Sequence, residues 1–84
     1  MPIISSFYGI KIYMYFRQAE HEPSHIHAVY GEYSGAFELK NLKMIEGDLP
    51  KNAKKLVKKW LQNHKDELQQ MWETQQFKEI PPLL

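Results

Sequence analysis

The sequence predicts a single α+β domain in which a small antiparallel sheet of three to four strands packs on one long C-terminal helix. Three observations predict this fold. Apolar and polar residues alternate in the N-terminal half, apolar residues recur with helical period from about 53 to 72, and short connections join the segments of the first half. Short connections favour antiparallel pairing, and the apolar faces of the sheet and the helix must bury each other.

The first predicted strand is the stretch FYGIKIYMYF, residues 7–16. Successive side chains of a strand point to opposite faces of the sheet, so each alternate set shares a face. The more uniformly apolar set is expected to face the core and comprises Tyr8, Ile10, Ile12, Met14 and Phe16. The open face would then carry Lys11, Tyr13, Tyr15 and Arg17.

Turn-forming residues divide the rest of the N-terminal half into further strands. A loop containing Pro23 leads into a second strand at 25–30, because proline and the residue before it are restricted to turn or extended geometry. A turn at Gly31 precedes the third strand, which continues to about residue 40. A reversal near Asn41 leads to a short fourth strand at 43–47.

The second half predicts one helix, with Asp48 as its N-cap and Pro50 in its first turn. At about 100° per residue, one broad arc collects the apolar side chains. The arc comprises Ala53, Leu56, Val57, Trp60, Leu61, His64, Leu68, Met71 and Trp72. A break at 62–66 is the alternative, since Asn63 is a weak helix former.

Composition sets the domain boundaries and the chemistry that is excluded. Pro81 and Pro82 forbid a helix at the end of the chain, so we expect one domain at 1–78 and a flexible tail at 79–84. The chain has no cysteine, which excludes disulfides and thiolate metal sites. We find no signal peptide and no run that is apolar enough to span a membrane, and we expect a cytoplasmic protein.

The stretch HEPSHIHA concentrates the chemistry-bearing residues, with His21, His25 and His27 close together. A strand sends the last two to the same face, and a His-x-His pair with a third nearby ligand is a recurring arrangement for zinc or another divalent metal. The three histidines are therefore the candidate metal ligands and catalytic residues, with Glu22 as a general base or fourth ligand. Two alternatives stay open: a metal-free site in which His25 and His27 act as base and acid, as in a ribonuclease, and a structural role in turn and edge hydrogen bonds. His64 is expected on the covered side of the sheet.

The open sheet face also predicts a binding surface. One helix cannot cover both faces of a sheet, so we expect a partner for the second face. The candidate binding residues are Tyr13, Tyr15, Arg17, His25, His27, Lys51, Lys55 and Lys58. Aromatic and basic side chains together suit RNA or DNA, and aromatic residues with arginine also suit a protein interface, including a homodimer.

In three segments the chain resembles the small bacterial proteins grouped as domain of unknown function 4160. The segments are MPIISSFYGIKIYMYF, HEPSHIHAVYGEY and GDLPKNAKKLVKKWLQNHKDELQQMW, in matching order and spacing, and they cover residues 1 to about 76. The matching positions are Pro2, Phe7, Gly9, His21, Pro23, His25, His27, Ala28, Leu49, Pro50, Trp60, His64, Glu67, Leu68 and Trp72. The lysine-rich helix departs from the family pattern.

The resemblance implies a toxin–antitoxin-type component, encoded beside a second small domain of unknown function (2442). It therefore implies a small protein encoded nearby as the partner, with nucleic acid as a further binding partner, and it assigns no catalytic residues. We expect a small protein that binds a partner protein or RNA. The alternative is a histidine-based, metal-dependent hydrolase or nuclease that uses the HEPSHIHA segment.

Overall fold

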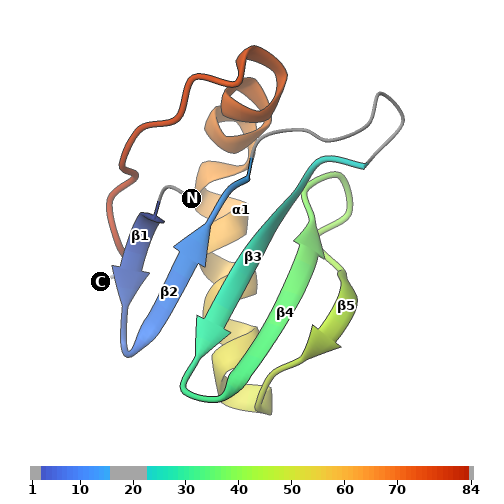
Figure 1. Ribbon diagram of the computed structural model, residues 1–84, viewed down its shortest axis with the longest axis vertical. Coiled ribbons are helices and arrows are strands. Elements are labelled where there is room, and N and C mark those ends of the chain that lie inside the picture. The colour runs from blue at the N-terminus through green and yellow to red at the C-terminus, as the bar shows by residue number, and fades with distance from the viewer. Residues whose placement is uncertain (1–2, 16–22, 84) are drawn as a thin grey trace.

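The computed structural model describes residues 3–15 and 23–83, and within them the chain forms one antiparallel sheet followed by one helix (Figure 1). The strands lie side by side in chain order, β1-β2-β3-β4-β5. The elements are β1 (Ile3–Phe7), β2 (Ile10–Tyr13), β3 (His25–Tyr30), β4 (Tyr33–Glu38), β5 (Met44–Asp48) and α1 (Lys51–Thr74). The α+β class and the antiparallel pairing are confirmed. The strand number is not, because the sheet has five strands instead of three to four.

The additional strand arises at the beginning of the chain, where a strand was predicted over 7–16. A two-residue turn at Tyr8 and Gly9, with φ angles of 49° and 80°, divides this stretch, and β1 begins at Ile3. Positive φ at both central residues is typical of a tight type I′ hairpin. The assignment of Tyr8 to the core was therefore wrong, and its side chain is 60% exposed. Phe7 instead shares the core with Ile10, its partner across the hairpin.

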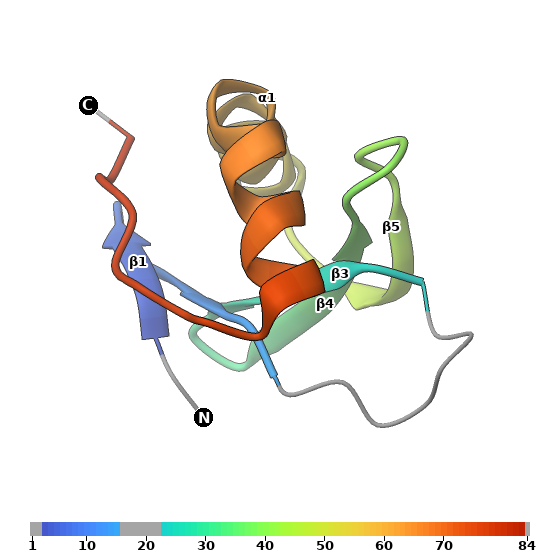
Figure 2. The same cartoon turned by 90° about the horizontal axis from the view of Figure 1, so that it is seen from above.

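The helix covers one face of the sheet, as the view from above shows (Figure 2). The apolar alternation of the strands supplies the sheet side of the core, with Ile10, Ile12, Met14, Ile26 and Phe37 fully buried. The predicted helical arc supplies the other side through Ala53, Val57, Trp60, Leu61, Leu68, Met71 and Trp72. Phe16, also predicted for the core, lies outside the described residues.

The helix begins later than predicted and is irregular at one residue. Asp48 is not its N-cap but the last residue of β5, and the N-cap is Pro50, which gives no side-chain hydrogen bond to the helix. Helix α1 runs from Lys51 to Thr74, but it is kinked at His64, whose φ of −128° and ψ of 17° are not helical values. The local break therefore falls directly after Asn63, inside the range that the sequence marked.

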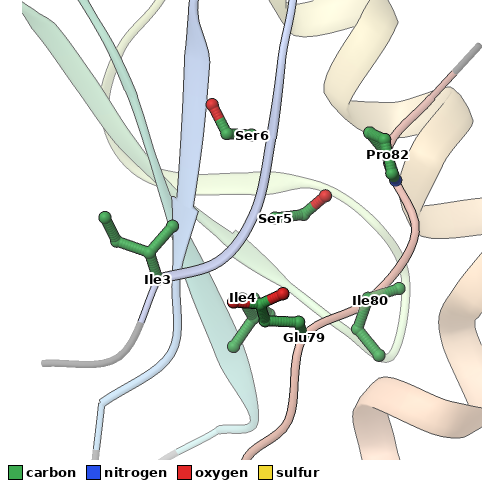
Figure 3. Close-up of a pocket in the computed structure, with 7 residues that line it drawn as sticks. All are labelled: Ile3, Ile4, Ser5, Ser6, Glu79, Ile80 and Pro82. Atoms are coloured by element: carbon green, nitrogen blue, oxygen red, sulfur yellow. The ribbon is translucent and has the colours of Figure 1, made fainter.

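A C-terminal segment, residues 75–83, follows α1 without helix or strand and returns alongside β1 in the same direction (Figures 1 and 3). Two hydrogen bonds hold it: the Ile80 N–H donates to the Ile4 carbonyl at 2.7 Å, and the Trp60 indole N–H donates to the Pro81 carbonyl at 2.9 Å. The predicted tail at 79–84 thus lacks regular structure over its described residues, while Ile80 within it is only 3% exposed.

Among the described residues, no helix combines the length and the apolar character that crossing a bilayer requires.

Gly47 supports the pairing of β4 with β5, and its substitution tests this part of the sheet. Its φ is +83°, and a Cβ there would clash with the Ser34 carbonyl oxygen and lie 2.8 Å from the Gly35 Cα. Because positive φ and overpacking each add strain, we expect Gly47→Ala to lower the free energy of unfolding by about 3 kcal/mol or more. Urea denaturation measures this change.

The matched control is Gly31→Ala, since Gly31 has φ +60° but nothing within 4 Å of an added Cβ. It should lose only the backbone contribution, about 1–2 kcal/mol. Equal losses in the two variants would contradict the close packing of β4 on β5.

Candidate functional site

Four side chains, Tyr13, Tyr15, His25 and His27, are joined by ring contacts, with Tyr13 and His27 on the sheet face that α1 leaves open, and we call them the aromatic–histidine cluster. The pairing of β2 with β3 puts Tyr13 opposite His27. The Tyr15 ring meets the His27 ring edge-on, with centroids 4.5 Å apart, and stacks on Tyr13 at 6.3 Å. The His25 and His27 rings are 5.0 Å apart. The structure therefore brings together the four residues for which the sequence predicts a shared open face.

His25 has a second environment that the sequence did not reveal. Its ring lies 5.0 Å from the ring of Trp72, in the last turns of α1, so it reaches from the sheet to the helix. Its Nδ1 lies 2.7 Å from the Pro23 carbonyl oxygen. A carbonyl oxygen only accepts, so Nδ1 carries the proton in this hydrogen bond. The Pro23 carbonyl thus orients His25, and Trp72 contacts the ring from the helix side.

Acidic residues extend the site on the β4–β5 side. Cross-strand pairs share a face, and the register pairs His25 with Glu38, Ala36 with Glu46 and Ser34 with Asp48. A shallow hollow of about 150 Å³ adjoins His27 and is lined by Ser34, Gly35, Ala36, Glu46 and Gly47. Sequence reasoning missed these carboxylates, because only the register of β4 and β5 brings them beside the histidines.

The predicted metal site stays a prediction. His21 and Glu22 lie outside the described residues, and so does Arg17 of the predicted binding set. Within residues 3–15 and 23–83, no group of three or more histidine or acidic side chains has a geometry that could hold a metal ion. His25 and His27 alone supply two of the three ligands that a catalytic zinc site needs.

The helix lysines of the predicted binding set do not share a surface with the cluster. Lys51, Lys55 and Lys58 are exposed on α1. The helix covers one face of the sheet (Figure 2), and its apolar arc is buried there, so these lysines point away from the sheet. Tyr13 and His27 alternate with the buried Ile12 and Ala28 along their strands, so they lie on the sheet's other face. A compact ligand therefore cannot contact both groups at once.

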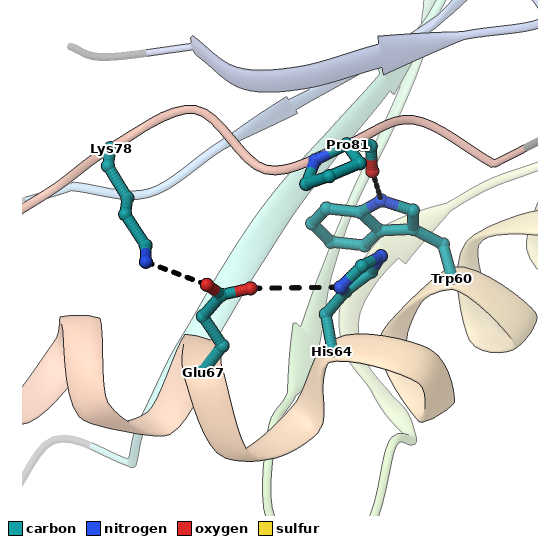
Figure 4. A network of polar contacts seen from close by, with 5 residues as sticks. All are labelled: Trp60, His64, Glu67, Lys78 and Pro81. Atoms are coloured by element: carbon teal, nitrogen blue, oxygen red, sulfur yellow. Dashed lines mark hydrogen bonds and ion pairs between the residues drawn. The ribbon is translucent and has the colours of Figure 1, made fainter.

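His64 lies on the helix side, as predicted, in a polar network that contacts the C-terminal segment (Figure 4). Its ring is 5.3 Å from that of Trp60, and its Nδ1 is 3.8 Å from a Glu67 carboxylate oxygen. The other oxygen of Glu67 pairs with the Lys78 ammonium at 2.7 Å. With the Trp60 bond to Pro81, these contacts connect α1 to the segment at two points.

The family profile described as a domain of unknown function (DUF4160) matches residues 9–73 of the chain. The chain belongs to this family. The match extends from the β1–β2 turn nearly to the end of α1, so the family domain contains the whole aromatic–histidine cluster. No curated protein and no solved structure matches the chain.

The Trp60 indole is expected to anchor the C-terminal segment, and Trp60→Phe tests this. The variant keeps a buried aromatic ring but loses the hydrogen bond to Pro81. Losing about 1 kcal/mol of net hydrogen-bond energy should raise the open population of the segment about fivefold. Limited trypsin digestion, followed by mass spectrometry of cleavage after Lys78, measures this opening.

Cleavage after Lys58, within α1, reports global unfolding in the same digest. Trp72→Phe is the matched control, because Trp72 is also buried and its ring contacts His25, while the bond that the segment makes to it, from the Gln75 side chain, goes to its backbone carbonyl and is kept in the variant. If both variants accelerate cleavage after Lys78 equally, the indole does not anchor the segment.

Proposed function

We propose that this chain is a protein-binding module that docks a small partner protein on its open sheet face, as one component of a toxin–antitoxin-type pair. The observation that carries the proposal is the preassembled aromatic–histidine cluster, whose Tyr13 and His27 stand on a face that no second layer covers within the described residues. Aromatic side chains are enriched in the buried centres of protein interfaces. Three of the four side chains stand on paired strands, which are rigid supports for a binding surface.

The charges on this face favour a protein partner over RNA. Glu38, Glu46 and Asp48 flank the cluster on one side, while Lys11 is the one lysine or arginine of the described strands on the open face. Phosphate groups would be repelled by this carboxylate edge, whereas nucleic-acid affinity depends mainly on cationic contacts to phosphates. A partner with basic residues around an apolar centre would complement both the cluster and the edge.

The family resemblance supports one identity for the partner. Members of the family that stand beside a second small domain of unknown function would have that domain as the ligand of the open face. This arrangement fits a cytoplasmic complex in which one protein masks the other. The lysines of α1 would stay exposed in such a complex and would be free for further acidic contacts.

The binding test uses the neighbouring gene's product and isothermal titration calorimetry. We expect Tyr15→Ala and His27→Ala each to weaken binding at least tenfold, since central aromatic contacts contribute about 2 kcal/mol or more at interfaces. Tyr33→Ala is the matched control, because Tyr33 is a 42% exposed tyrosine on β4 outside the cluster. It should change the affinity by less than about twofold.

Two results would contradict the proposal. One is binding that the cluster variants leave unchanged. The other is tight binding of a single-stranded RNA that depends on Lys51, Lys55 and Lys58 and not on Tyr15. Elemental analysis of untagged wild-type protein and of the His25→Ala/His27→Ala double variant separates the hydrolase alternative, which requires stoichiometric metal that the double variant loses.

A further inference from the structure

A cleft of about 390 Å³ lies between β1 and the C-terminal segment (Figure 3), at the opposite edge of the sheet from β5. Its apolar walls come from Ile3 and Ile4 on one side and from Ile80 and Pro82 on the other. The polar residues that line it are Ser5, Ser6 and Glu79. Mostly apolar walls with a few polar groups are typical of a ligand-binding cleft.

The Ser5 hydroxyl is the observation that sets this cleft apart from an ordinary surface hollow. Ser5 is 7% exposed, and its Oγ is buried without a hydrogen-bond partner among the described residues. Buried hydroxyls are almost always hydrogen-bonded, because burial removes their hydrogen bonds to water and an unpartnered hydroxyl gains none in return. The hydroxyl points from β1 toward the C-terminal segment, into the space between them (Figure 3).

The backbone of β1 adds unpaired groups at the same place. β1 is an edge strand, and Phe7 and Ile10 form the pair that closes the β1–β2 hairpin. In an antiparallel ladder the next pair, Ser6 with Lys11, directs its backbone groups away from the partner strand. The N–H and carbonyl of Ser6 therefore point off the edge of the sheet, beside the Ser5 hydroxyl.

Pro82 prevents the C-terminal segment from pairing with the Ser6 carbonyl. The segment runs alongside β1 and makes one backbone bond to it, from Ile80 to Ile4. Continued pairing would require an N–H at position 82 to reach the Ser6 carbonyl, and Pro82 has none. The Pro81 carbonyl is bonded to Trp60 instead, which holds the segment toward the helix. The cleft thus stays open beside the Ser6 backbone groups of β1.

We propose that this cleft binds an extended peptide segment of a protein, which adds a strand to the β1 edge. The peptide backbone would pair with the Ser6 N–H and carbonyl, and one of its polar groups would bond the Ser5 hydroxyl. Glu79 selects a basic side chain at one end of the peptide, and the isoleucines accept an aliphatic one. This site is separate from the open sheet face and does not depend on the function proposed above.

The probe is a random heptapeptide library displayed on phage, selected against the full-length wild-type chain. We expect enrichment of aliphatic peptides that carry a basic residue and have no proline at positions that pair with Ser6. Synthetic copies of the enriched peptides should slow hydrogen exchange of the Ser6 amide, as monitored by nuclear magnetic resonance. Affinities are then measured by fluorescence anisotropy.

Two variants test the cleft in different ways. Ser5→Ala removes the hydroxyl and should weaken peptide binding about tenfold, with unchanged or raised thermal stability, since an unpartnered buried group is lost. Pro82→Ala supplies an N–H that lets the segment pair with Ser6 and compete with the peptide, so it should also weaken binding about tenfold. Ser34→Ala, on the open face, is the matched control and should bind as wild type does.

The proposal fails if no peptide is enriched, or if enriched peptides bind Ser5→Ala and Pro82→Ala as tightly as wild type. It also fails if exchange slows at open-face amides such as that of His27 while the Ser6 amide is unaffected. If Ser5→Ala loses the circular dichroism spectrum of the folded protein, Pro82→Ala alone tests the proposal. Position 82 lies in a segment without helix or strand, so we expect this substitution to leave the fold intact.

Discussion

The packing of α1 on one face of the sheet is the constraint on which the rest of this structure depends. Trp60 is at its centre, fully buried, with its ring 5.7 Å from that of Phe7 on β1 and its indole N–H bonded to Pro81 of the C-terminal segment. One residue thus connects the helix, the edge strand and the end of the chain. Because a single helix can bury only one face of a five-stranded sheet, the same packing leaves the opposite face and the β1 edge available for partners.

The two surfaces left available differ in chemistry, because one is a face of the sheet and the other is its edge. On the open face β2, β3 and β4 each pair with a strand on both sides, so recognition there depends on side chains such as Tyr15 and His27. At the β1 edge the ladder itself ends, and the groups on offer are the Ser6 backbone and the Ser5 hydroxyl. The first surface suits a folded partner with a complementary patch, and the second suits an extended segment.

Residues whose position depends on local periodicity were predictable from the sequence, and residues whose position depends on register were not. Burial of Ile10, Ile12 and Trp60 follows from alternation and helical period, because apolar side chains recur wherever one face is covered. The shared face of His25 and His27 follows in the same way. The prediction that Tyr8 is buried was wrong because the period-two pattern continues across a two-residue turn. Only Gly9, which follows Tyr8, marks the reversal of the chain. The acidic edge and the contact of His25 with Trp72 depend on residues far apart in the chain.

The helix side and the sheet side of the molecule carry opposite charges. Lysines without acidic residues occupy the first turn of α1, where the helix dipole is unfavourable to cations, and Pro50 provides no side-chain cap. The carboxylates of Glu38, Glu46 and Asp48 lie on the other side of the sheet. A nearly neutral chain with net charge +1 is therefore divided into a cationic helix face and an anionic sheet edge. A basic partner approaching this chain would be steered past α1 and onto the open face, and such steering weakens as salt increases.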